Sequence, residues 1–127
     1  MTSIDKVLGK CPDLTFFEEE ALDGSTSGFG VVEGKVVGVY NMLPLDFRAV
    51  STGLEIFDRE KGYARQFILH ITKLLRERKA WHAVALNPDA YQKLTHIFKG
   101  LGYEEDMPMH FHKDYRTSAT IDVQAMP

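Results

Sequence analysis

A cluster of positive charge surrounds a glycine in the stretch DREKGYAR, residues 58–65. Cations attract phosphate oxygens, and a residue with no Cβ or a small side chain lets the backbone approach a ligand closely. The cations are Arg59, Lys61 and Arg65, and the small residues are Gly62 and Ala64. Together these residue types predict a site for a pyrophosphate. The alternative is that the glycine serves only the geometry of a turn and the basic residues serve only solubility.

The position of this stretch favours the phosphate interpretation. The residues before it, VSTGLEIF at 50–57, are typical of a strand. The residues after it, 65–79, predict a helix, because apolar residues recur along one side. That stripe consists of Phe67, Ile68, Ile71, Leu74 and Leu75. A helix that starts directly after a strand presents its free N–H groups and the positive end of its dipole to an anion.

The remaining elements predict a mixed α/β layer, with an antiparallel meander followed by at least one parallel crossover. Two short helices are expected first, at 3–9 and 15–24, the second with Thr15 and Glu18 at capping-box spacing. Valine-rich runs on both sides of EGK predict a hairpin over 28–43, which Pro44 ends. The later elements expected are a strand at 48–57, a strand at 81–86, a helix at 87–103 capped by Asn87, and a strand at 109–115. The tail, 116–127, is either a strand or an arm that packs on a partner.

Composition excludes several classes of protein. The 127 residues fit one domain, assigned as 1–127, and no apolar run is long enough for a membrane span. The stretch MTSIDKVLGK lacks a signal-peptide core, so the expected compartment is the cytoplasm. The net charge of −3 argues against a nucleic-acid partner, although residues 59–79 hold seven Lys or Arg and two Glu. Cys11 is the only cysteine, which excludes an intrachain disulfide.

The basic loop is the first of three landmarks that occur in a fixed order. REKGYA has the form R-x-x-G-x-A, Asn87 follows the next strand, and the phrase FKGLGY begins at Phe98. In this order and spacing, they resemble the GNAT superfamily of acyl-coenzyme A-dependent N-acetyltransferases over residues 29–115. The resemblance implies a helical N-terminal part at 1–28, a sheet and cofactor core at 29–115, and a tail at 116–127. It implies acetyl-coenzyme A (acetyl-CoA) as the acyl donor, an amine as the acceptor, and no metal.

The resemblance also implies roles for individual residues. Backbone groups of Leu54 and Ile56 would pair with the pantetheine arm, and backbone N–H groups from Lys61 to Arg65 would hold the pyrophosphate. Asn87 would lie near the pantetheine. The thiol end would lie near Phe98 and Lys99. The full set expected at the cofactor is Leu54, Ile56, Arg59, Lys61, Gly62, Tyr63, Ala64, Arg65, Asn87, Phe98 and Lys99.

The catalytic groups are not identified by the sequence. Many GNAT proteins have a tyrosine at the position of Phe98, whose hydroxyl can protonate the leaving thiolate, and phenylalanine cannot do this. Glu55 alternates to the face opposite Leu54 and is a weak candidate. The remaining candidates share aromatic or imidazole chemistry. They are Tyr63, Tyr91 and Tyr103 as acids, His110 and His112 as a pair without a third metal ligand, and His70, His82 and His96 as structural residues.

Two main interpretations therefore stand. The first is an N-acyltransferase acting on an unidentified amine. The second is a GNAT-like binding or structural protein without catalytic activity, such as a virion component of a tailed bacteriophage. Its assembly or dimerisation would use the C-terminal residues 116–127. Two features favour the second: Phe98, and an N-terminal part that is expected to begin in helix rather than in the family's first strand. A nucleic-acid binder using residues 59–79 is a third, weaker alternative.

Overall fold

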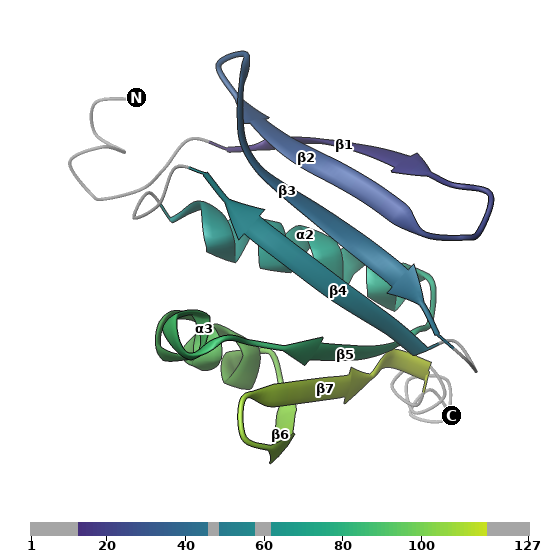
Figure 1. The fold of residues 1–127 in the computed structure, drawn as a ribbon, viewed down its shortest axis with the longest axis vertical. Coiled ribbons are helices and arrows are strands. Elements are labelled where there is room, and N and C mark those ends of the chain that lie inside the picture. Colours follow the sequence, from purple (N-terminus) through teal and green to yellow (C-terminus); the bar gives the residue numbers. More distant parts are fainter. Residues whose placement is uncertain (1–12, 46–48, 58–61, 117–127) are drawn as a thin grey trace, which may run out of the picture.

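A computed structural model describes residues 13–45, 49–57 and 62–116. They form a seven-stranded sheet in the order β1-β2-β3-β4-β5-β7-β6, in which only the β4–β5 pair is parallel (Figure 1). The strands are β1 Thr15–Glu20, β2 Thr26–Val32, β3 Lys35–Pro44, β4 Ala49–Ile56, β5 Trp81–Ala85, β6 Glu104–Met107 and β7 His110–Asp114. The helices are α2 Tyr63–Glu77 and α3 Pro88–Gly100. The predicted mixed α/β class with one parallel crossover is confirmed.

The N-terminal part differs from the prediction. Residues 15–24, expected as a helix, form β1 and a tight turn into β2, so the helical assignment of 1–28 is wrong for its described part. The strand is favoured because its side chains alternate. Phe16 packs edge-on against Phe67 of α2 at 5.1 Å, whereas Phe17 stacks on its partner Phe29 at 5.3 Å. The first element among the described residues is therefore a strand, and the predicted helix at 3–9 lies outside them.

The hairpin between β2 and β3 follows the prediction. Glu33 and Gly34 form its two-residue turn, both with positive φ (51° and 78°), which suits the twist of the paired strands. Pro44 is the last residue of β3, as expected. β4, β5 and β7 lie within the strands predicted at 48–57, 81–86 and 109–115, of which residue 48 is outside the described residues, whereas the short β6 was not predicted.

Both described helices pack on one face of the sheet. Phe67 of α2 is fully buried, and its ring lies where Gly30 and Gly38 carry no side chains. A Cβ on Gly38 would come within 2.9 Å of that ring, so glycine is what lets the helix approach. Phe98 of α3 stacks on Phe111 of β7 at 5.6 Å, on the same face. In Figure 1, α2 lies behind β3 and β4. No helix of the described chain is long and apolar enough to cross a membrane.

Candidate functional site

The sheet opens between its two parallel strands. In the described chain, β4 and β5 pair only from Ala49 and Trp81 to Ser51 and Ala83. Beyond that point they separate, and Figure 1 shows their arrowheads apart, with α3 beside the end of β5. A cavity of about 730 Å³ occupies the opening. Its walls come from β4, the first turns of α2, β5 and α3, so the splay brings four elements around one space.

The start of α2 forms one end of this cavity. Gly62 is its N-cap in the left-handed conformation, with φ of 79°, and it makes no side-chain capping bond. The first turn contains no acidic residue, and Arg65 is exposed there on the cavity wall. The N–H groups of a helix N-terminus next to a cation suit a phosphate. The positive φ favours glycine for the geometry of the turn, whether or not a ligand binds there.

The predicted cofactor residues divide into three groups. Those that line the cavity are Leu54, Ile56, Gly62, Tyr63, Ala64, Arg65, Asn87 and Phe98. Arg59 and Lys61 lie outside the described residues. Lys99 is not part of the cavity wall, and its Nζ lies 3.9 Å from Glu105 Oε1.

Two of the lining residues have clear structural roles. Asn87 caps α3, as predicted, because its Oδ1 accepts a hydrogen bond of 2.7 Å from the N–H of Ala90. Phe98 is buried, and its ring packs edge-on against Tyr103 at 5.1 Å. Phe98 therefore contributes an apolar wall and no proton donor.

A polar chain of four hydrogen-bonded side chains, Thr52, His82, Tyr103 and Tyr115, begins on the cavity wall near the point where β4 and β5 pair. The sequence did not predict these contacts. His82 of β5 is 1% exposed and lies 2.7 Å, through Nε2, from the hydroxyl of Thr52 on β4. Its Nδ1 lies 2.5 Å from the Tyr103 hydroxyl, which in turn lies 3.0 Å from the hydroxyl of Tyr115. Burial lowers the pKa of His82 to about 3, so this imidazole is neutral at pH 7. Burial and the neighbouring Tyr115 raise the pKa of Tyr103.

The only sign of this hydrogen-bonded set in the sequence was His82, a polar residue within the apolar strand WHAVAL. That signal did not show that Thr52 and Tyr103 meet His82, because they lie 30 and 21 residues away along the chain.

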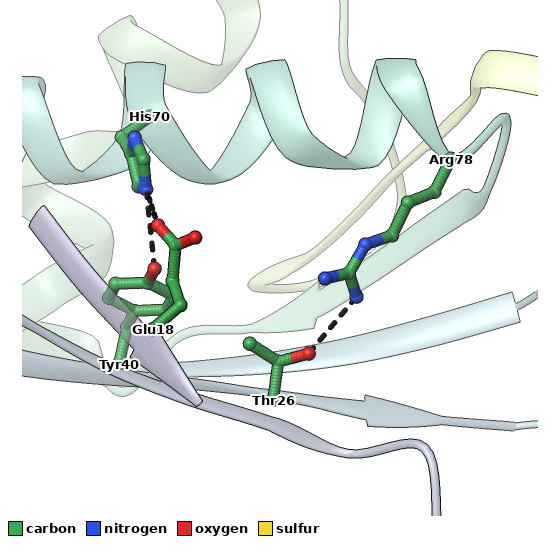
Figure 2. A network of polar contacts seen from close by, with 5 residues as sticks. All are labelled: Glu18, Thr26, Tyr40, His70 and Arg78. Carbon is green, nitrogen blue, oxygen red and sulfur yellow. Dashed lines mark hydrogen bonds and ion pairs between the residues drawn. The ribbon is translucent and has the colours of Figure 1, made fainter. Parts of the chain in front are cut away.

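A second polar network lies between α2 and the N-terminal strands, outside the cavity wall (Figure 2). Glu18 and Tyr40 point from the sheet to His70, whose Nε2 is 3.2 Å from the Tyr40 hydroxyl and in direct contact with Glu18. Burial works to raise the pKa of Glu18, but hydrogen bonds from Tyr40 and His70 outweigh it, and the pKa is lowered. Arg78 donates to Thr26 at 3.1 Å. This network joins α2 to the sheet.

Each histidine of the β7 pair has a partner of its own. His112 lies 3.5 Å from Asp106, and Nδ1 of His110 lies 2.9 Å from the carbonyl oxygen of Pro108. Among the residues that the structure describes, no three His, Cys, Asp or Glu side chains gather where an ion could bind.

Solved structures share this arrangement of strands and helices. The Bacillus subtilis acetyltransferase in complex with CoA matches at a TM-score of 0.61 and 13% identity, over 72% of this chain and 77% of that one. The E. coli protein YhhK bound to coenzyme A matches at 0.61 and 11%, over 81% and 99%. The GNAT domain of S. lividans PAT matches at 0.61 and 15%, over 76% and 64%. This chain has the GNAT fold.

Among the comparisons with known proteins, only those with solved structures support the GNAT likeness. No protein-family model matches the sequence, and no curated protein matches it. The identities of 11 to 15% establish the architecture. Any function has to be argued from the site itself.

Proposed function

We propose that this protein is an N-acyltransferase that transfers an acetyl group from acetyl-CoA to an amine. The observation that carries the proposal is the cavity between the separated strands β4 and β5, whose wall includes the N-terminus of α2. A phosphate group suits that part of the wall, because the N–H groups of a helix N-terminus and the Arg65 guanidinium lie there. CoA is also the ligand named for two of the similar structures.

Different residues of the cavity wall would contact the pantetheine arm and the pyrophosphate of acetyl-CoA. At Leu54 and Ile56, β4 pairs with β3 but not with β5, so the edge that faces β5 would pair with the amides of an extended pantetheine arm, as with an added strand. Gly62 to Arg65 would hold the pyrophosphate, and we propose that Arg59 and Lys61 add charge there. Asn87 and Phe98 would form the far wall. The donor supplies an activated thioester, and the protein orients it towards the attacking amine.

A second candidate function is a GNAT-like binding or structural protein without chemistry, for example in a virion. Phe98 favours it, because an apolar ring fills the place where many GNAT proteins carry a tyrosine. The helix N-terminus on the cavity wall favours the enzyme, because a scaffold has no use for an anion site there.

Calorimetric titration with CoA and acetyl-CoA tests the proposal. We expect saturable heat for both and a raised melting temperature, since a ligand at a hundred times its Kd stabilises the folded state by about 2.7 kcal/mol. Binding should weaken as salt rises. Absence of heat and of any thermal shift at millimolar ligand would reject the proposal.

Thiol release from acetyl-CoA, measured with a panel of amines, separates the two candidate functions. Turnover supports the acyltransferase. Binding of CoA without turnover on any amine supports the inactive protein.

A further inference from the structure

The polar chain that joins β4 to β5 ends in the hydroxyl of Thr52, which lies on the cavity wall. The described cavity wall includes three hydroxyl side chains, those of Thr52, Tyr63 and Thr72. Tyr63 is in the first turn of α2. The hydroxyl of Thr72 donates to the carbonyl of Leu69 at 3.0 Å. Thr52 is therefore the hydroxyl available to a ligand where β4 and β5 meet.

Thr52 stands at the point that a ligand's innermost atoms would reach. Ser51 is the last residue of β4 that pairs with β5, and Thr52 is the next residue along the strand. From Thr52 to Ile56 the strand rises about 13 Å, at roughly 3.3 Å per residue, which suits an extended arm with two amide groups. With phosphates at Gly62, the end of such an arm lies beside Thr52.

The direction of the hydrogen bonds decides what Thr52 can do. His82 is neutral, so its ring carries one proton, either on Nδ1 or on Nε2. A phenol O–H is a stronger hydrogen-bond donor than the N–H of a neutral imidazole. The shortest hydrogen bond among Thr52, His82, Tyr103 and Tyr115, at 2.5 Å, joins the Tyr103 hydroxyl to Nδ1 of His82. We assign this bond as Tyr103 O–H donating to Nδ1. The proton of His82 is then on Nε2 and is donated to Thr52, which leaves the O–H of Thr52 free to donate.

We propose that Thr52 donates a hydrogen bond to the sulfur of the acyl donor and is a catalytic residue, with His82 and Tyr103 as its positioning residues. This inference rests on the proposed function. When the amine nitrogen bonds to the thioester carbon, the C–S bond breaks and its electron pair goes to sulfur. The Thr52 hydrogen bond stabilises that charge, and the proton of the amine is lost to solvent. Thr52 thus supplies the donor that Phe98 lacks.

The tautomer of His82 is the first test, and it needs no ligand. Long-range ¹⁵N–¹H correlation spectra of the wild-type protein distinguish a proton on Nε2 from one on Nδ1. We expect the proton on Nε2. A proton on Nδ1 would make Thr52 the donor to His82 and would overturn the proposal.

The second test measures the thiol pKa of CoA bound to the protein, from the ultraviolet absorbance of the thiolate as pH rises. In the wild type and in Thr52→Ser we expect a value about one pH unit below that in Thr52→Val, because only the first two retain the donor. The charged groups on the wall, such as Arg65, Asp89 and Lys93, are the same in all three proteins and cancel in the comparison.

The outcomes separate the inference from the proposed function. Equal thiol pKa values in three proteins that all bind CoA overturn the role of Thr52 and leave the acyltransferase standing. Failure of the wild type to bind CoA removes both. If Thr52→Val does not fold, Thr52→Ala takes its place, and the tautomer measurement on the wild type decides independently.

Discussion

The two faces of this sheet use the same strands and differ in almost every other respect. On the face that carries α2 and α3, Phe67, Phe111 and His82 are almost completely buried. On the opposite face, Phe17 and Phe29 stack on each other yet remain 49% and 40% exposed. No helix among the residues described here lies over them. The cavity, the helix terminus and the buried polar chain all belong to the first face.

The difference shows that side chains alternating between the two faces of a strand do not by themselves create a core. In β4, Leu54 points to the cavity face and its neighbour Glu55 is exposed, and in β5 the buried His82 follows Trp81, which is 37% exposed. A strand presents both faces equally, and only a covering element removes water from one of them. Chemistry that needs a low dielectric is therefore confined to the helical face.

The largest expected effect compares one aromatic from each face. Phe67→Ala should reduce the free energy of unfolding by about 3–5 kcal/mol, because it leaves a cavity between α2 and the sheet. Phe29→Ala should cost about 1 kcal/mol or less, since the ring is already partly in water. Urea denaturation of both variants measures the difference. Equal losses would mean that something covers the second face in solution.

Sequence patterns predicted the elements whose signals are local. The hairpin over 28–43 and the helix after Gly62 could be predicted because turn residues and apolar periodicity lie within each segment. β1 could not, because TFFEEE carries a capping-box signal, and only its pairing with β2 makes it a strand. The cavity wall was partly predictable from the GNAT resemblance, whereas the contact between His82 and Thr52 depends on pairing of distant strands.

The next effect concerns how the free energy of unfolding depends on pH, and it compares a histidine from each face of the sheet. The pKa of His82 is depressed in the fold, so below about 6.5 the unfolded chain takes up a proton that the folded chain does not. Stability should therefore fall as pH falls from 6.5 towards 3, by about 2 kcal/mol from this residue between pH 6.5 and 5. His82→Gln should remove that part of the slope.

The control for this effect is the exposed His110 of β7. His110→Gln should keep the wild-type pH dependence of the urea midpoint. A wild-type slope in His82→Gln would show that His82 already becomes protonated within the fold over this range.

A smaller effect separates backbone geometry from ligand contact. Gly62 and Gly34 have almost the same φ, 79° and 78°, but Gly34 is in the hairpin turn with open space around it. Alanine at either position should cost about 1–2 kcal/mol of stability from left-handed strain. Only Gly62→Ala should also weaken CoA binding, by about tenfold, because its Cβ stands at the helix terminus. Unchanged binding would make Gly62 a turn residue only.

The smallest expected effect tests one cation against another on the same helix. Arg65 lines the cavity, whereas Lys73 is exposed further along α2 and is not part of the wall. Removing either with glutamine changes the net charge equally, so any long-range attraction of the anionic ligand falls equally. Arg65→Gln should weaken CoA binding about threefold more than Lys73→Gln, in line with about 0.7 kcal/mol for an exposed charge pair. Calorimetry at low and moderate salt measures both, and the excess loss should shrink as salt screens the phosphate contact. Equal losses from the two variants would leave Arg65 with only a general electrostatic role and would place the phosphate recognition in the backbone of α2 alone.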